Sequence, residues 1–246
     1  MLYDVSKLDL LYAGKTKNVY ALSGGNVLLQ FTNKTTMNES GEEDPGGNFV
    51  GKDVEGSGRA CILMTQHFFK LFEETGIPTH LVNIDVEDLQ IEVKQVLPIG
   101  EKVCLESGSG VEWIGRWIAT GSFVKHYAKY IADGHQFTKP FVHATLKDDF
   151  RGDPYIDDYT LDRLGLLSVE KFQILKEYTE KIAEIMKNEF EKLGCQLYDF
   201  KVEYGEDNNG NLILIDEIGP GSARVFQNGK KMNKIEIGNL FEKVSF

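Results

Sequence analysis

The chain of 246 residues has no long hydrophobic run and no cluster of basic residues. Nowhere do 18 or so apolar residues follow one another, so no membrane-spanning helix is expected. The 27 Lys and Arg are outnumbered by 38 Asp and Glu, which gives a formal net charge of −11. That balance argues against a protein whose main role is to coat nucleic acid or an anionic membrane, so positive charge for anionic ligands must be local.

Cysteine and histidine are scarce and ungrouped. Cys61, Cys104 and Cys195 form no CxxC pair and have no histidine at metal-ligand spacing, so we expect reduced and mostly packed thiols. The N-terminus lacks the basic start and apolar stretch of a signal peptide, which favours a cytoplasmic protein. The histidines form no triad and no HExxH motif, so none is assigned a catalytic role. They are His67, His80, His126, His135 and His143.

The spacing of apolar and turn residues predicts a mixed α and β chain. Short apolar runs from Leu10 to Phe31 predict antiparallel strands, and residues 32–58 are so polar that they predict a long connection. Apolar residues three and four apart predict one helix over 59–75 and a longer one from Ser168 to Gly194. Further strands are predicted at 79–84, 89–97 and 111–118, and a hairpin at 195–218, followed by a Gly/Pro loop and a short polar tail.

The hairpin carries the most informative pattern. Along 199–204, apolar residues take one face and charged residues, Lys201 and Glu203 among them, take the other. Asn209-Gly210 is the preferred type I′ turn, and counting outward from it pairs Glu203 with Asp216. Two carboxylates roughly 5 Å apart repel by about 3 kcal/mol at an effective dielectric of ~20, unless a cation lies between them. Mg²⁺ would suit such oxygen ligands; a slipped register or two solvated carboxylates is the alternative.

Two other segments suggest anion binding. Gly14, Lys15, Thr16 and Lys17 form a turn that can direct backbone N–H groups and two ammonium groups toward a polyphosphate, although the spacing is not that of a P-loop. A solvated lysine pair is the alternative there.

The second segment ends a strand and begins a helix. Ser122 near the helix N-cap and Arg116 close by could bind a phosphate monoester; an ordinary capped helix with Arg116 paired to a surface acid is the alternative. Segments 147–154 and 219–224 are interpreted as solvated loops, although Arg224 is well placed for substrate contact.

In chain order these segments resemble the SAICAR synthetase family of purine-pathway ligases, and the likeness covers most of the chain. The residues that carry it are Gly14–Lys17 with Val19–Tyr20, Glu112 with Arg116, Ala119–Ser122, Lys147–Asp149 with Asp153–Pro154, Asp199–Gly205, and Asp216–Glu217 with Arg224.

The resemblance implies a fold and a reaction. The fold would be α+β, with an antiparallel N-terminal sheet domain, residues 1–98, similar to a kinase small lobe and packed on a larger α/β domain, residues 99–246, with ATP in the cleft. In the implied reaction, ATP phosphorylates the carboxylate of carboxyaminoimidazole ribonucleotide, and the amine of L-aspartate then attacks to give an amide, ADP and phosphate. Assembly stays open, a homodimer being one option.

The resemblance also implies which residues form the site. The catalytic group would be Lys147, Lys201, Glu203 and Asp216, with the lysines near the transferring phosphoryl group and the two carboxylates holding Mg²⁺. Two further sets would hold the nucleotides. ATP would contact Gly14, Lys15, Thr16, Lys17, Val19, Val27 and Val96, and the phosphorylated substrate would contact Arg116, Ser122, Arg224 and Lys234.

Several loops depart from the family pattern. Gly56-Ser57-Gly58 and then Cys61-Ile62-Leu63 stand where the family has Gly-Lys-Gly followed by Asn-Asn-Lys or Asn-Asn-Arg. Gly219-Pro220-Gly221 replaces Ser-Pro-Asp, and Met232-Asn233-Lys234 replaces Met-Asp-Lys. These changes indicate either a divergent subfamily that makes the same product or a ligase that joins a different carboxylate or amine. A nucleotide-binding protein without turnover is the alternative from another class.

Overall fold

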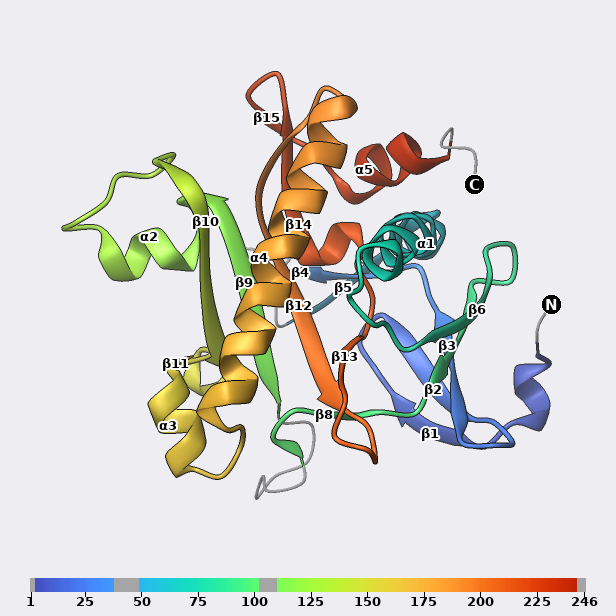
Figure 1. Ribbon diagram of the computed structural model, residues 1–246. Coiled ribbons are helices and arrows are strands. Elements are labelled where there is room, and N and C mark those ends of the chain that lie inside the picture. The colour runs from blue at the N-terminus through green and yellow to red at the C-terminus, as the bar shows by residue number, and fades with distance from the viewer. Residues whose placement is uncertain (1–2, 38–48, 102–109, 243–246) are drawn as a thin grey trace. The chain divides into compact units, whose positions relative to one another are not determined.

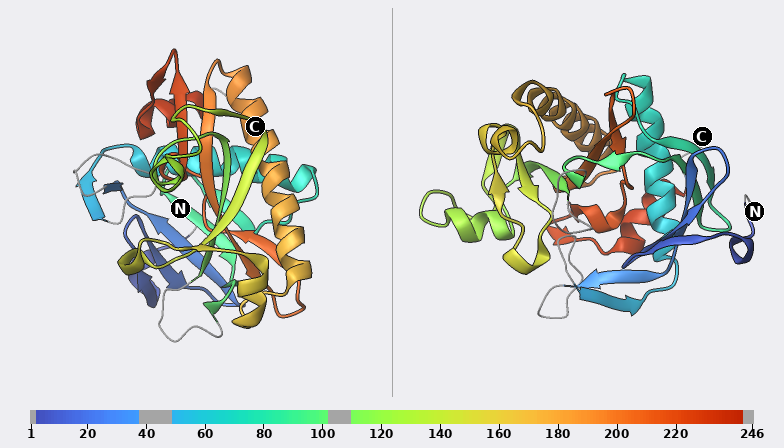
Figure 2. Two further views of the ribbon diagram at one scale, coloured as in Figure 1. Left: turned by 90° about the vertical axis from the view of Figure 1, so that its left-hand side faces the viewer. Right: turned by 90° about the horizontal axis from the view of Figure 1, so that it is seen from below.

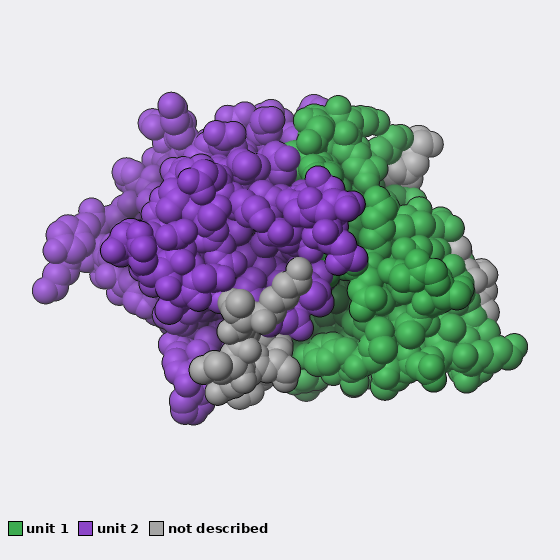
Figure 3. All heavy atoms as spheres, turned by 60° about the horizontal axis from the view of Figure 1, so that its bottom comes forward, with its two compact units in different colours: residues 1–96, 217–222, 232–246 green, residues 97–216, 223–231 purple. Residues whose placement is uncertain are grey.

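The computed structural model describes residues 3–37, 49–101 and 110–242. Cys104 and the stretch 38–48 of the long polar connection lie outside these ranges. The chain divides into two units, coloured separately in Figure 3. Unit 1 comprises residues 1–96, 217–222 and 232–246, and unit 2 comprises residues 97–216 and 223–231.

Unit 1 contains a five-stranded antiparallel sheet in the order β1-β2-β3-β7-β6. The antiparallel strands predicted between Leu10 and Phe31 are therefore confirmed. The sheet strands are β1 (Leu10–Ala13), β2 (Lys17–Ala21), β3 (Asn26–Phe31), β6 (Leu81–Asp85) and β7 (Gln90–Lys94), preceded by a 3₁₀ turn, η1 (Val5–Lys7).

A second small sheet forms inside the segment that was predicted to be a polar connection. Strands β4 (Lys34–Met37) and β5 (Phe49–Asp53) pair antiparallel. Thr35 is fully buried, and its hydroxyl donates to the Lys52 carbonyl over 3.2 Å. The β-branched residues of this segment favour extended backbone even where the overall composition is polar.

Two helices of unit 1 pack on each other: α1 (Ser57–Glu74) and α5 (Lys234–Phe241). The helix predicted over 59–75 is confirmed as α1. The predicted polar tail is wrong, because Asn233 and Glu236 form a capping box that starts α5. Gly238 lies so close to Ala60 that a side chain there would collide with α1. A 3₁₀ turn, η4 (Pro220–Ser222), contacts both helices.

Unit 2 is built on a sheet in the order β11-β10-β9-β12-β14-β15, with β8 and β13 also paired to β12. Its helices are short except for one, α4. Its strands are β8 (Leu97–Pro98), β9 (Val111–Ile118), β10 (Gln136–Leu146), β11 (Tyr155–Ile156), β12 (Gln196–Glu206), β13 (Leu212–Ile215), β14 (Ala223–Gln227) and β15 (Lys230–Lys231), and its helical elements are α2 (Ser122–Tyr127), η3 (Asp149–Arg151), α3 (Asp158–Arg163) and α4 (Val169–Lys192).

Helix α4 covers one face of this sheet (Figure 1, Figure 2). The ring centroid of Phe172 lies 4.6 Å from that of Trp113 on β9, and the Thr179 hydroxyl lies 2.9 Å from the Tyr204 hydroxyl of β12. The Ser168 side chain caps the helix start, and the left-handed Gly194 follows its end, so the predicted helix is confirmed. Among the described residues, no helix is both long and apolar enough to cross a membrane.

The hairpin of β12 and β13 has a different register from the predicted one. Glu203 pairs with Ile215, and Glu206 with Leu212, so Glu203 does not face Asp216. The loop is one residue longer than a type I′ turn, because the Asp207 side chain accepts backbone hydrogen bonds from Asn209 and Asn211. Gly210, at φ 82°, then supplies the left-handed residue of a three-residue hairpin loop.

Candidate active site

The face of the unit 2 sheet opposite α4 carries polar side chains in three parallel rows. Directly paired residues of antiparallel strands point to the same face, and the next residue on that face is two positions along, so neighbouring rows lie roughly 7 Å apart. The arginine row is Phe141, Arg116, Asp199 and Arg224; the middle row is His143, Ile114 and Lys201; the glutamate row is Tyr155, Thr145, Glu112 and Glu203.

The arginine row holds a buried three-residue charge network. One oxygen of Asp199, Oδ2, accepts from Arg116 Nη1 at 2.5 Å and from Arg224 Nη1 at 2.8 Å. Arg116 and Asp199 are almost fully buried, whereas Arg224 is partly exposed. Two guanidinium groups and one carboxylate leave one net positive charge. Such a group is suited to an anion, and the fork geometry of arginine suits a phosphate in particular.

Ser122, predicted to help bind the same phosphate, lies close to this network. Gly121 immediately precedes it, and a Cβ atom on Gly121 would lie 3.2 Å from Arg224 Nη2. Gly121 is the N-cap of α2, so Ser122 is the first helical residue, near the N-cap as predicted, and Arg116 Nη1 donates to the Thr120 carbonyl at 2.8 Å. The structure thus brings Arg116, Ser122 and Arg224 together.

The glutamate row and its neighbours hold two lysine–glutamate pairs. Lys147 Nζ donates to Glu203 Oε1 at 2.7 Å, and Lys201 Nζ donates to Glu112 Oε1 at 2.6 Å. Burial opposes the charged form of Lys147, but Glu203 and Asp216 outweigh it and raise the pKa of this lysine. Burial also raises the pKa of Glu112, against the effect of Lys201. The cluster therefore keeps both lysines protonated beside carboxylates.

The carboxylates predicted to hold a metal are both in unit 2, although not paired across strands. Lys147 already offsets the charge of Glu203, so the repulsion expected from the predicted register does not arise. Asp216 follows β13 with φ 67°, a left-handed conformation that is uncommon outside glycine. Within the part of the chain that the structure describes, no group of three or more Asp, Glu, His or Cys is arranged to hold a metal ion.

The predicted polyphosphate turn is in unit 1, between β1 and β2. The Gly14 N–H donates to the Lys17 carbonyl at 2.9 Å, and a Cβ atom on Gly14 would lie 2.6 Å from that oxygen. Only glycine therefore fits this tight turn. Lys17 forms an ion pair with Glu217, while Lys15 is exposed. The Thr16 carbonyl accepts from the Thr32 N–H at 2.9 Å, which ties the turn to the end of β3.

The residues proposed for the adenine slot lie on or near the unit 1 core. Val27 is 8% exposed and belongs to a cluster that includes Leu29 and Ile91, and Val19 packs against that cluster. Val96 is partly buried. Lys234, predicted to contact substrate, begins α5, and its Nζ lies 3.5 Å from where a Cβ atom on Gly221 would be.

Sequence reasoning missed two residues of the polar face. His143 and Thr145 on β10 alternate with apolar residues and point to the same side as Arg116 and Glu112. The signal was the alternation along 141–146, which was not interpreted as a strand. The prediction that no histidine has a catalytic role was based on motifs alone, and motifs do not report which residues a sheet places side by side.

The polar face has the features of an enzyme site for phosphorylated substrates. Paired arginines stand at one end, and the glutamate row, whose carboxylates accept hydrogen bonds from Lys147 and Lys201, stands two rows, roughly 14 Å, away. The first group can hold a phosphate, and the second can stabilise negative charge that develops at a reacting group.

Comparison with known proteins agrees with this class and narrows it. The model of the SAICAR synthetase family matches residues 10–239. A phosphoribosylaminoimidazole-succinocarboxamide synthase of Clostridium tetani is 41% identical over 95% of this chain and 99% of its own. The phosphoribosylaminoimidazole-succinocarboxamide synthase of Methanocaldococcus jannaschii is 31% identical over 92% of this chain and 84% of its own.

Solved structures give the same result. One described as SAICAR synthetase (Type-2) in complex with ADP matches with a TM-score of 0.78 and 25% identity, covering 94% of both chains. Another, Protein TM1243 (SAICAR synthetase), matches with a TM-score of 0.73 and 30% identity, covering 89% of this chain and 86% of that one. The chain belongs to the SAICAR synthetase family and has its α+β fold.

Proposed function

We propose that this protein is an ATP-dependent ligase of de novo purine biosynthesis that condenses carboxyaminoimidazole ribonucleotide with L-aspartate to give SAICAR, ADP and phosphate. We further propose that it works in the cytoplasm. The observation that carries the proposal is the polar face of unit 2, where the arginine row and the glutamate row stand roughly 14 Å apart. A ribonucleotide with a phosphate at one end and a carboxylate at the other suits that arrangement.

The arginine row would bind the 5′-phosphate. Arg224 is partly exposed, and its Nη1 donates to Asp199, which holds the guanidinium on the arginine row where the phosphate would bind. Arg116 adds charge from a buried position, and Ser122 adds a hydroxyl. Asp199 offsets only one of the two arginine charges. The group therefore keeps a net positive charge, and binding of a phosphate monoester should be favourable even with that carboxylate in place.

The lysines of the second cluster would act where phosphoryl transfer occurs. A carboxylate does not react with an amine at neutral pH, so its oxygen must first become a good leaving group as phosphate. Lys147 and Lys201 are held protonated by Glu203 and Glu112, and fixed positive charge stabilises the charge spread over a transferring phosphoryl group.

The same cluster suits Mg²⁺, which in nucleotide-dependent enzymes neutralises phosphate charge. Mg²⁺ takes oxygen ligands and often only one or two carboxylates, completing its shell with water and phosphate oxygens. Glu203 uses one oxygen for Lys147, which leaves the other for a cation, and Asp216 is close enough to raise the pKa of the same lysine. These two residues would hold the ion.

The nucleotide would be held by the turn of unit 1. Gly14 brings backbone N–H groups into a tight turn, and Lys17, oriented by Glu217, would contact ATP phosphates together with Lys15 and Thr16. The apolar residues Val19, Val27 and Val96 would contact the adenine.

The first experiment measures ADP release from purified protein with Mg-ATP, carboxyaminoimidazole ribonucleotide and L-aspartate, each omitted in turn, with the amide product identified by mass. Release that requires all three, together with the succinocarboxamide, is expected. Bound ATP with no turnover would point to a different carboxylate or amine. No binding of ATP would refute the proposal.

A further inference from the structure

Three buried polar atoms on the polar face have no hydrogen-bond partner among the described residues. They are His143 Nδ1, Thr145 Oγ1 and Arg116 Nε. Buried polar groups of folded proteins nearly always have a partner, because an unsatisfied donor or acceptor loses its hydration without compensation. Unsatisfied atoms on a substrate-binding face therefore suggest that the substrate itself supplies the partner.

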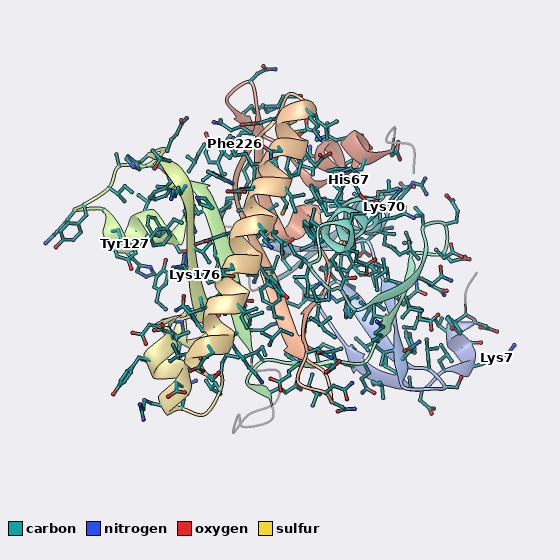
Figure 4. All side chains as sticks on the ribbon, in the orientation of Figure 1. Lys7, His67, Lys70, Tyr127, Lys176 and Phe226 are labelled. Atoms are coloured by element: carbon teal, nitrogen blue, oxygen red, sulfur yellow. The ribbon has the colours of Figure 1, made fainter. Side chains whose placement is uncertain are left out.

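His143 is held in a fixed position by aromatic rings. Its ring centroid lies 4.8 Å from that of Tyr155, 5.5 Å from that of Phe141 and 6.2 Å from that of Phe123. Tyr127, labelled in Figure 4, belongs to the same aromatic cluster, because its ring centroid lies 4.8 Å from that of Phe123. Burial, and secondly Arg116, lower the pKa of His143 to about 3. The imidazole is therefore neutral at physiological pH, with one nitrogen as donor and the other as acceptor. Such a group suits a hydroxyl better than an anion.

The order of the three rows on the sheet determines which part of a bound ribonucleotide His143 would contact. With the 5′-phosphate on the arginine row and the reacting carboxylate at the glutamate row, the sugar between them lies over the middle row. Among the residues of that row, Ile114 is apolar and Lys201 is paired with Glu112. His143 is thus the neutral hydrogen-bonding side chain that faces the sugar.

We propose that His143 binds a ribose hydroxyl of the phosphorylated substrate and so helps the enzyme select a ribonucleotide over a deoxyribonucleotide. This inference rests on the proposed function, because it takes the substrate to be a ribonucleotide. It assigns to His143 a role in specificity rather than in the chemical step.

The test compares His143→Phe with the unchanged enzyme, using the ribonucleotide and its 2′-deoxy and 3′-deoxy analogues. Phe keeps the ring and removes both nitrogens. The KM for the ribonucleotide should rise about tenfold, the effect of one hydrogen bond, while the KM values for ATP and aspartate change less than twofold. One deoxy analogue should be a poor substrate for the unchanged enzyme and as good as the ribonucleotide for the variant.

Two further variants keep the result interpretable. His143→Asn places an amide where Nδ1 stands and should retain most of the selectivity, which a merely structural role of the ring would not explain. His135→Phe is the matched control, because His135 is exposed yet also contacts the aromatic cluster, through Phe137. It should leave every KM unchanged.

The inference fails if His143→Phe keeps the original KM for the ribonucleotide, or keeps the original discrimination against both deoxy analogues. Nδ1 would then be satisfied by water. These outcomes are distinct from failure of the proposed function, which would appear as absence of turnover in the unchanged enzyme.

Discussion

At the residue scale, the polar face of unit 2 separates two kinds of charge pairing. Asp199 shares one oxygen between two arginines and leaves a net positive group, whereas Glu112 and Glu203 each accept from one lysine. The first arrangement favours an added anion, and the second keeps lysines charged without excess positive charge. The two ends of one substrate can therefore be treated differently by the same sheet.

Replacing Glu203 with Gln should remove turnover without unfolding the protein. The isosteric amide cannot offset Lys147 or bind a cation strongly, so we expect the rate of ADP release to fall about 100-fold or more. The free energy of unfolding should fall by only about 1–2 kcal/mol, because the Glu203 side chain is mostly buried but Lys147 is 41% exposed and keeps Asp216 to offset its charge. Steady-state assays and urea unfolding measure the two effects.

A matched control exists on the same strand. Glu206 pairs with Lys171 at 2.6 Å, outside the three rows, so Glu206→Gln should leave turnover unchanged. Full activity of the Glu203 variant would show that this carboxylate has no part in the reaction.

Arg224→Ala should weaken binding of the phosphorylated substrate selectively. The Arg224 guanidinium is partly exposed, and Asp199 still has Arg116 as a partner after the Arg224 side chain is removed. Hydrogen bonds to charged groups contribute roughly 1.5–3 kcal/mol, so the KM for the ribonucleotide should rise about 10-fold to 100-fold, with the KM for ATP within twofold. Equal increases in both KM values would contradict a separate phosphate site.

Arg116→Ala is a poorer test of the same site. Arg116 is almost fully buried against Asp199, and removing one partner of a buried pair costs roughly 3–5 kcal/mol. Thermal unfolding should separate the two variants, with the Arg116 variant much less stable than the Arg224 variant.

At the scale of elements, the loop between β12 and β13 determines where the carboxylates lie. Asp207 accepts from two backbone N–H groups and from the Asn211 side chain at 2.8 Å, and this capping competes with the tight turn that Asn209-Gly210 would otherwise form. The pairing shifts by one residue, and Asp216 lies beyond the end of β13 instead of opposite Glu203.

Replacing Gly210 in this loop should lower the stability of the protein by a measurable amount. At φ 82° an alanine is strained, so Gly210→Ala should lower the free energy of unfolding by about 1–2 kcal/mol. Asn tolerates left-handed backbone, so Gly210→Asn should lose less than the Ala variant. Urea unfolding of both variants compares them; equal losses would show that backbone strain is not the cause.

At the scale of the whole molecule, buried His143 should make stability depend on pH. Its pKa is about 3 in the folded protein and about 6.5 when unfolded, so between these values the unfolded chain binds more protons. Stability therefore falls as pH falls from about 6.5 toward 3, by at most about 1.4 kcal/mol per pH unit from this residue.

Thermal unfolding between pH 7 and pH 4 tests this effect. His143→Phe removes the titrating group, so its melting temperature should fall less steeply with decreasing pH than that of the unchanged protein. His135→Phe should follow the unchanged protein, because His135 is exposed. Parallel curves for all three proteins would show that folding does not lower the pKa of His143.

Local elements were predictable because their signals lie within a few residues. Helices α1 and α4 and strand β9 begin and end within two residues of the bounds that apolar spacing and turn residues predict. Strand β10 was missed and the hairpin register was wrong, since turn chemistry at Asp207 outweighed the Asn-Gly preference. The helix α5 was missed because its capping signal, Asn233 with Glu236, is short and follows a glycine-rich loop.

The sequence by itself determined the family, the chemistry of its charged residues and the alternation that places Lys201 and Glu203 on one face, because these depend on residue identity and on the period of a strand. Only the tertiary structure decided which residues become neighbours. The pairing of β9 with both β10 and β12 brings Arg116, Asp199 and His143 together from distant segments. Such pairing depends on long-range packing that no local pattern encodes, and it gave Asp199 its two arginine partners and placed His143 on the polar face.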